Sequence, residues 1–195
     1  MPTDVVEDIV VVAERELRVV RPRDAEALLD EEAFEHEEFL PYWAELWPSA
    51  LTLAAAVAVR DLRGMRTVEL GCGLAVPSVT AALAGAEALA TDWSEDALAF
   101  AARNANLNGA AVETLLCSWT APQPLIERGP FDVVLASDVL YERPNVEPLL
   151  ELLPLLAGEV LLADPGRPAL PEFIERAAGR SRVEASGSVH RLVLR

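Results

Sequence analysis

The stretch Val68-Glu69-Leu70-Gly71-Cys72-Gly73 ends an apolar run in two glycines, and Asp92 follows 19 residues after the second glycine. A strand that breaks into glycines, begins a helix and returns to a strand ending in a carboxylate is typical of nucleoside-binding folds. The glycines lack the side chains that would keep the backbone from a ligand, and the amides of the next helix point toward the same place. The pattern predicts a nucleotide-like cofactor.

The residues around this loop narrow the class of ligand. Position 76, where a dinucleotide fingerprint has its third glycine, is Val76, and no Gly-Lys-Ser/Thr run is present, so binding of a phosphate chain is disfavoured. Asp92 follows the apolar run 88–91, and its two oxygens can accept hydrogen bonds from both ribose hydroxyls. Two glycines alone would fit a packing turn equally well; Asp92 favours a nucleoside without phosphates.

Composition limits the class of protein. A chain of 195 residues fits one domain that buries roughly 70% of its unfolded surface without a metal or disulfide. The net charge of −16 opposes a nucleic-acid partner, and every basic residue is Arg. We expect a soluble cytoplasmic protein. The only two cysteines, Cys72 and Cys117, lie beside apolar segments and suit a reducing compartment, the N-terminus does not resemble a signal peptide, and the apolar stretch 51–59 is too short to span a bilayer.

From residue 67 onward, short apolar runs alternate with longer helical stretches, which is typical of βα units in a doubly wound, mostly parallel sheet. The expected strands are 67–70, 87–91, 112–117, 131–136 and 159–163. The sequence predicts two helices from residues that favour helix ends. The first has Pro77 in its first turn and Gly85 at its C-terminus, and the second is capped by Ser94 and ends at Asn108-Gly109. Two further helices are expected at 145–156 and 170–178.

The two ends of the chain differ from this pattern. Residues 182–195 contain alternating apolar positions around Ser186-Gly187-Ser188 and predict a terminal hairpin with an antiparallel strand. Residues 9–12 and 17–20 are rich in β-formers, and the acidic segment 30–38 is expected to be a solvated helix face or a lid. We therefore expect an N-terminal extension, 1–40, followed by one compact domain, 41–195.

Several motifs together resemble a known family. The run 68–73, Asp92 and Asp138-Val139-Leu140-Tyr141 resemble the seven-strand S-adenosylmethionine-dependent methyltransferases. The runs 41–49 and 137–141 and the run Asp164-Pro165-Gly166-Arg167 are similar to runs in the protein-lysine methyltransferases that include the electron-transfer-flavoprotein β-subunit lysine methyltransferase. The likeness covers about 41–167 and implies an α/β, Rossmann-like fold with a mostly parallel seven-stranded sheet and an antiparallel C-terminal strand.

The resemblance also implies roles for individual residues, with S-adenosylmethionine as the cofactor. It places Gly71 and Gly73 near the methionine part, Asp92 at the ribose, Trp119 beside the adenine, and Asp138 with Tyr141 as the catalytic pair beside the acceptor amine. Ala75 and Ser118 depart from the family pattern, which has glycine and an acid there more often. The implied cofactor-binding residues are Trp47, Glu69, Gly71, Gly73, Asp92, Trp93, Trp119 and Ala136.

The chemistry of amine methylation limits what these residues can do. An acceptor lysine, whose free pKa is about 10.4, must lose its proton before it attacks. The Asp138 carboxylate favours the ammonium form, so we assign it to substrate binding, whereas Tyr141 can offer a hydroxyl, a π face or simple packing. Trp43 and Trp47 would share a face if both were helical. Trp43 is expected in the core, and for Trp47 packing in the core and the family's cofactor contact are equally supported.

Other functions are less well supported. His36 and His190 lie in polar surroundings, no residues have metal-ligand spacing, and Ser78 and Ser137 lack a nucleophile elbow. The leading hypothesis is methylation of a protein lysine, with the electron-transfer-flavoprotein β subunit as one possible partner and with no nucleic-acid, membrane or metal partner. Methylation of a small amine or heteroaromatic nitrogen is a second possibility, and a non-catalytic nucleoside-binding module is a third. A nicotinamide dehydrogenase is disfavoured by Val76.

Overall fold

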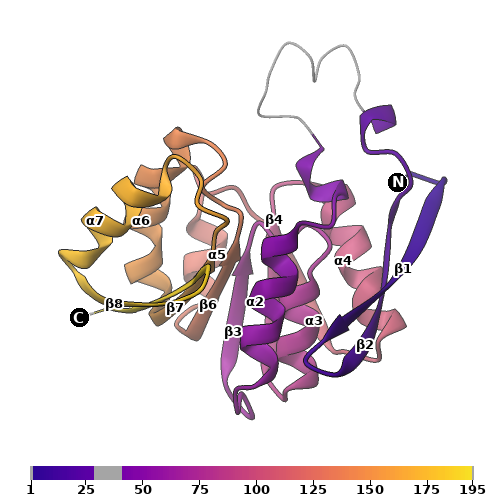
Figure 1. Ribbon diagram of the computed structural model, residues 1–195, viewed down its shortest axis with the longest axis horizontal. Coiled ribbons are helices and arrows are strands. Elements are labelled where there is room, and N and C mark those ends of the chain that lie inside the picture. Colours follow the sequence, from indigo (N-terminus) through magenta and orange to yellow (C-terminus); the bar gives the residue numbers. More distant parts are fainter. Residues whose placement is uncertain (1, 29–40, 195) are drawn as a thin grey trace.

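The computed structural model describes residues 2–28 and 41–194, in which a seven-stranded sheet carries helices on both faces (Figure 1). Its order is β5-β4-β3-β6-β7-β9-β8: the first five strands are parallel, β9 is antiparallel to β7, and β8 is antiparallel to β9. The sheet consists of β3 (Arg66–Leu70), β4 (Glu87–Asp92), β5 (Val112–Leu116), β6 (Phe131–Ser137), β7 (Ala157–Ala163), β8 (Ser181–Ser186) and β9 (Val189–Leu194). The expected fold class and the terminal hairpin are confirmed. The acidic segment 30–38 and His36 lie outside the described residues.

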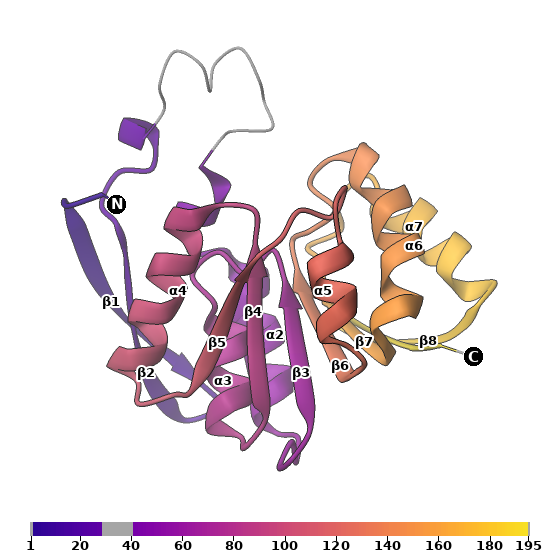
Figure 2. The ribbon, with the colours of Figure 1, turned by 180° about the vertical axis from the view of Figure 1, so that it is seen from behind.

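Alternation along the central strands divides the core between the two faces of the sheet. Val133 and Leu135 of β6 cluster with residues of two helices, α2 (Pro48–Ala58) and α3 (Val76–Leu83). Val134 and Ala136 of the same strand point to the opposite face and cluster with residues of α5 (Gln123–Arg128), α6 (Val146–Leu156) and α7 (Leu170–Ala178). Figures 1 and 2 show these two groups of helices on opposite sides of the sheet. No described helix is long and apolar enough to cross a membrane. The helices are α2 (Pro48–Ala58), α3 (Val76–Leu83), α4 (Glu95–Leu107), α5 (Gln123–Arg128), α6 (Val146–Leu156) and α7 (Leu170–Ala178).

The helix ends follow the local signals in the sequence. The Ser94 hydroxyl accepts a hydrogen bond from the Ala97 amide at 3.2 Å and caps α4, as predicted. Gly85 has φ +95° just after the last turn of α3, and Gly109 has φ +65° after α4. Both glycines therefore end helices in the left-handed region, which a side chain would strain.

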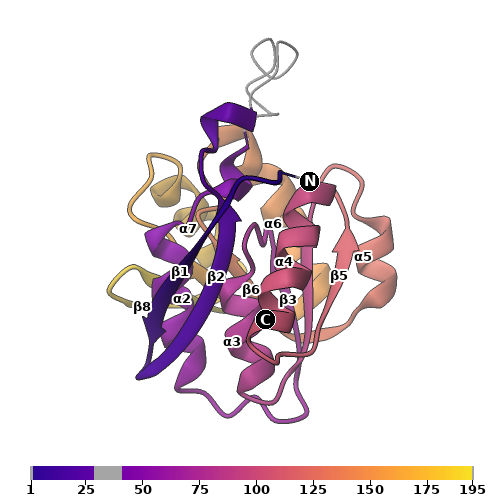
Figure 3. The same ribbon diagram turned by 90° about the vertical axis from the view of Figure 1, so that its right-hand side faces the viewer.

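An N-terminal hairpin forms a separate two-stranded sheet on the outer side of helices α2 to α4 (Figure 3). Its strands, β1 (Val5–Val12) and β2 (Arg15–Pro22), are longer than the two predicted pieces. Ala13 and Glu14 form the turn with φ +46° and +68°, a twist that suits a hairpin although neither residue is glycine. The hairpin shares a core cluster with Phe100 of α4.

Asn104 of α4 joins the hairpin to the glycine loop. Its Oδ1 accepts a hydrogen bond from the Val20 amide at 2.8 Å, and its Nδ2 donates to the carbonyl oxygens of Val20 and Leu74 at 3.1 Å each. The Asn104 side chain is buried, so water could not take its place as the hydrogen-bond partner of these backbone groups. One amide therefore connects β2, α4 and the residue that follows Gly73.

We predict that Asn104→Ala lowers the free energy of unfolding by about 2–4 kcal/mol, because it leaves buried backbone groups of Val20 and Leu74 unpaired. Urea titration followed by circular dichroism measures the change. Asn106→Ala is the matched control, since Asn106 is exposed on the same helix and should change stability by less than about 0.5 kcal/mol. Equal losses in the two variants would contradict the role of Asn104.

Candidate functional site

The loop after β3 bends through left-handed backbone at three positions. Gly71, Gly73 and Ala75 have φ of +61°, +49° and +60°. Glycine adopts this region freely, whereas Ala75 is strained there. The loop is held at its start by the Cys72 amide, which donates to the Thr91 carbonyl oxygen at 2.9 Å.

Both glycines also allow close approach of a tryptophan. A Cβ added at Gly71 would lie 3.2 Å from Cζ2 of Trp119, and one added at Gly73 would lie 3.1 Å from the carbonyl oxygen of Trp43. The absent side chains thus make room for protein atoms as well as for a ligand. The ring of Trp119, the residue expected to flank the adenine, therefore lies close to the backbone of Gly71.

Asp92 ends β4 beside this loop and is fixed by backbone amides. Its Oδ2 accepts a hydrogen bond from the Gly73 amide and its Oδ1 accepts one from the Ser94 amide, both at 3.0 Å. Burial raises the pKa of the carboxyl, and the amides of Gly73, Ser94 and Trp93 oppose that rise. Each carboxylate oxygen keeps a further lone pair, so the group can still accept a hydrogen bond from a ligand.

Glu69 and Cys72 are buried near Asp92 but differ in exposure to the cavity. Desolvation raises the pKa of Glu69 to about 8, although Oε2 accepts hydrogen bonds from the amide and hydroxyl of Ser78 at 2.9 and 2.5 Å. Oε1 is buried with no hydrogen-bond partner among the described residues, which is less unfavourable for a neutral acid than for a carboxylate. Burial beside Asp92 and Glu69 raises the pKa of the Cys72 thiol well above its usual range, so it is no thiolate nucleophile.

Asp138 follows β6 and forms an ion pair with Arg167 across the site. Nε and Nη2 of Arg167 lie 2.9 and 2.8 Å from Oδ1 of Asp138. Asp138 has φ +58°, and its amide donates to the Ala163 carbonyl oxygen at 3.0 Å. The Cζ atom of Arg167 also lies 5.5 Å from the centroid of the Trp47 ring, a cation–π geometry.

Two further aromatic rings, those of Tyr42 and Tyr141, pack in sequence from Trp47. The Tyr42 ring lies 5.3 Å from that of Tyr141 and 6.3 Å from that of Trp47, between ring centroids, and the Trp47 indole donates to the Tyr42 carbonyl oxygen at 2.8 Å. Burial, and then the Glu142 carboxylate, raise the pKa of Tyr141. Its phenol therefore stays protonated at neutral pH and is not a base.

The arrangement of Trp43 and Trp47 differs from the sequence expectation. Trp43 lies in a short 3-10 turn, Tyr42–Ala44, and packs on Phe100, with 5.4 Å between ring centroids. Trp47 has extended backbone and precedes α2, so the two residues do not share a helix face. The condition for a common face is therefore not met, because Pro48 begins a new helix. As expected, Trp43 packs against a core cluster, although its side chain is only partly buried.

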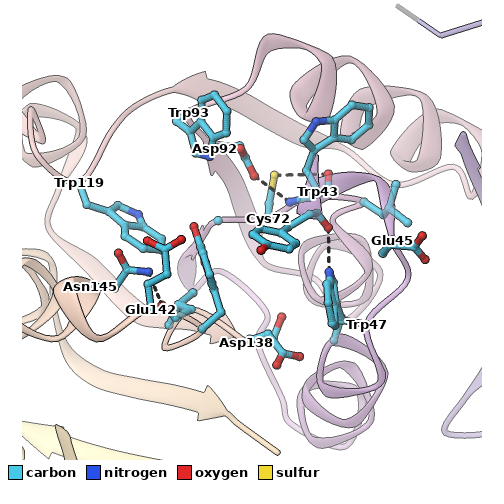
Figure 4. Close-up of a pocket in the computed structure, with 18 of the residues that line it drawn as sticks. Trp43, Glu45, Trp47, Cys72, Asp92, Trp93, Trp119, Asp138, Glu142 and Asn145 are labelled. Atoms are coloured by element: carbon cyan, nitrogen blue, oxygen red, sulfur yellow. Dashed lines mark hydrogen bonds between the residues drawn. The ribbon is translucent and has the colours of Figure 1, made fainter. Parts of the chain in front are cut away.

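One cavity of about 770 Å³ brings these groups together (Figure 4). Gly71, Gly73 and Asp92 line it, as do the four tryptophans Trp43, Trp47, Trp93 and Trp119 and the pair Asp138 and Tyr141. Ala136 and Glu69 do not line it: Ala136 is buried in the core cluster and the next residue, Ser137, faces the cavity instead. Among the described residues, no group of three or more His, Cys, Asp or Glu side chains is placed to hold a metal ion.

Sequence reasoning assigned no role to Arg167 or Tyr42, although both lie in motifs that it singled out. Arg167 ends the run 164–167, and Tyr42 lies in the run 41–49. The sequence signal for Arg167 was a single cation four residues after the apolar strand that ends at Ala163, just as Asp138 follows the strand that ends at Ser137. Pairing the two required knowledge that β6 and β7 are adjacent.

Comparison with solved structures supports the architecture. The chain is similar to a Thermus thermophilus 16S rRNA N2 G1207 methyltransferase solved in complex with AdoMet and guanosine, with a TM-score of 0.69 and 15% sequence identity. The alignment covers 100% of this chain and 52% of that one. At this identity the likeness shows the fold alone.

Curated relatives are similar over part of their length. The chain is 30% identical to a histone-arginine methyltransferase METTL23 of Xenopus laevis, over 56% of this chain and 49% of that protein. It is 31% identical to a protein N-lysine methyltransferase METTL21A of Danio rerio (59% and 56% covered), and 27% identical to an electron transfer flavoprotein beta subunit lysine methyltransferase of Danio rerio (65% and 51% covered). The chain spans about half the length of these relatives.

A family-level comparison is more extensive. The family described as lysine methyltransferase matches residues 41–163, which is more than half of the chain and includes the glycine loop, Asp92 and the Asp138 to Tyr141 motif. This chain therefore belongs to the lysine methyltransferase family.

Proposed function

We propose that this protein is an S-adenosylmethionine-dependent methyltransferase that modifies the side-chain amine of a lysine in a protein. The observation that carries the proposal is that a single cavity joins the bare loop at Gly71 and Gly73 and the fixed Asp92 carboxylate to Asp138 and Tyr141. Asp92 ends β4 and Asp138 follows β6, with β3 between them, so they are about two strand spacings, roughly 10 Å, apart across the sheet. This separation supports the proposal that the nucleoside and the acceptor bind at different ends of the cavity.

The residues present fit the cofactor. A cavity of about 770 Å³ lies within the range of roughly 300–1,000 Å³ usual for ligand sites. Asp92 would hold the ribose, the glycine loop would approach the methionine part, and Trp119 would flank the adenine. When bound, the cofactor would supply a sulfonium-activated methyl group for transfer to the acceptor nitrogen.

The protein's own task is mainly alignment and charge control. The acceptor nitrogen must be neutral. Tyr141 stays protonated, and no histidine is among the described cavity-lining residues, so the nitrogen bases of the chain do not take its proton. We propose that the proton leaves to water before attack. Alignment of a neutral amine with the methyl group then provides most of the rate acceleration.

A protein substrate is supported by charge and by the relatives. The chain has a net charge of −16, and Glu45 and Glu142 line the cavity, which favours a lysine presented within a basic surface. Two relatives are named as lysine methyltransferases of proteins, and one of them acts on the electron transfer flavoprotein beta subunit, which we propose as a first candidate substrate. The two buried free cysteines, Cys72 and Cys117, support a reducing, cytoplasmic location.

We predict that Asp92→Ala weakens binding of S-adenosylhomocysteine by about 1.5–3 kcal/mol, or about 10- to 150-fold, the scale of hydrogen bonds to a charged group. Calorimetry with this compound and its 2′-deoxy analogue separates a ribose contact from a disturbed loop. The native protein should prefer the parent compound, and the variant should bind both alike. Glu95→Ala, exposed at the start of α4, is the control. A preference for the parent compound that survives in Asp92→Ala would refute the ribose role.

We predict that Asp138→Ala reduces turnover at least 10-fold while the Kd for S-adenosylhomocysteine changes less than about 2-fold, because Asp138 lies on the acceptor side. Single-turnover transfer and calorimetry measure the two quantities. A parallel loss of both would place Asp138 at the cofactor instead.

We also predict that, with methyl-labelled S-adenosylmethionine and a cell lysate, the label enters a protein band and is recovered as methyl-lysine after acid hydrolysis. Asp92→Ala serves as the control protein and should label weakly. Label recovered only in small molecules would support the small-amine alternative, and methyl-arginine would show that the acceptor resembles that of the METTL23 relative.

A further inference from the structure

The ion pair between Arg167 and Asp138 bears on a conflict in the proposed reaction. An isolated carboxylate beside the acceptor would stabilise the ammonium form, which cannot attack. In the structure the Asp138 carboxylate already has a cationic partner, since Oδ1 lies within 2.9 Å of two guanidinium nitrogens of Arg167. The acceptor amine therefore meets a paired charge rather than a free anion.

Arg167 is held in this position by more than the ion pair. Asp164 is buried, and its Oδ1 accepts hydrogen bonds from the amides of Gly166 and Arg167 at 2.8 and 2.7 Å, which fixes the backbone of the arginine. The guanidinium lies over the Trp47 ring, and the Asp138 amide is tied to the end of β7. Only 23% of the Arg167 side chain and 9% of the Asp138 side chain are exposed, so the pair is weakly screened by water.

Apart from Arg167, the described charged or titratable residues that line the cavity include no cation. They are acids, phenols and thiols: Tyr42, Glu45, Cys72, Asp92, Cys117, Asp138, Tyr141 and Glu142. Arg143, in the loop after β6, lies outside the lining and pairs with Glu172, and Asp164, which holds the backbone of Arg167, is an acid. Arg167 is thus the cation that balances the acceptor side of the cavity within the described residues.

We propose that Arg167 is a positioning residue for methyl transfer: it neutralises Asp138 and aims its carboxylate, so that an acceptor amine can bind beside the pair and still lose its proton near neutral pH. This inference rests on the proposed function. In this proposal the second carboxylate oxygen of Asp138 positions the acceptor amine. Arg167 controls the protonation of that amine by neutralising the carboxylate.

The pH dependence of turnover tests the proposal directly. The rate with a lysine substrate should rise with pH as the bound amine loses its proton. Arg167→Met removes the cation and leaves the Asp138 carboxylate unpaired, which raises the pKa of the bound amine. The rising limb of the pH–rate profile should therefore move to higher pH by about 1 unit. At pH 7.5 both kcat and KM should be lower than in the native protein. In the double variant Asp138→Asn/Arg167→Met the limb should return to the native position.

Controls separate this effect from damage to the fold. Arg182→Met removes an exposed arginine paired with Glu184 in β8 and should leave the limb in place. Arg167→Gln provides a second neutral variant if Arg167→Met does not fold. A lower kcat with an unmoved limb in every neutral Arg167 variant would overturn the proposal, because that result indicates a structural role only.

A binding measurement separates failure of this proposal from failure of the proposed function. Butylammonium, which imitates a lysine side chain, should bind at least 5-fold more tightly to Arg167→Met than to the native protein, and this gain should vanish in the double variant. If the native protein methylates no lysine but this gain is observed, the proposed substrate class fails while the pairing stands. If no gain is seen, Arg167 does not neutralise Asp138 in solution and the inference is wrong.

Discussion

The hydrogen bond from the Gly73 amide to the Asp92 carboxylate connects the loop after β3 to the end of the neighbouring strand β4. Both residues line the cavity. β3 and β4 are paired in parallel, so Leu70 and Thr91 end side by side and the chain leaving each strand enters the same crevice. The left-handed backbone at Gly71 and Gly73 turns the loop so that an amide faces the carboxylate. Because protein groups already hold the buried Asp92, a ligand meets an oriented acceptor and does not have to order it.

Much of the fold could be predicted because its signals are local. The apolar runs of the five parallel strands, the Ser94 cap and the glycines after α3 and α4 each depend on a few adjacent residues. The hairpin strands were predicted too short, since Val5 to Asp8 and the charged positions of β2 lack a continuous apolar pattern. No helix was predicted over α5, which has only 6 residues and carries little periodicity.

The site was harder to predict than the fold, because its contacts join distant segments. The glycine loop and Asp92 were found by spacing, and the structure places them together. The pair of Asp138 and Arg167 is separated by 29 residues and meets only because β6 and β7 are neighbours. Trp47 faces Arg167 because Pro48 starts α2 and leaves the tryptophan extended, a backbone change that four-residue spacing does not reveal. Residue types were therefore readable from the sequence, whereas partners were not.

The concentration of aromatic rings at the cavity has a practical consequence. The chain contains four tryptophans, and all four line this one cavity. Its intrinsic ultraviolet emission therefore originates almost entirely from indoles that a bound compound would touch or cover. Binding of a compound in the cavity should therefore change the tryptophan fluorescence of the unlabelled protein, either by quenching it or by shifting its emission maximum. Little of the signal would come from the rest of the molecule.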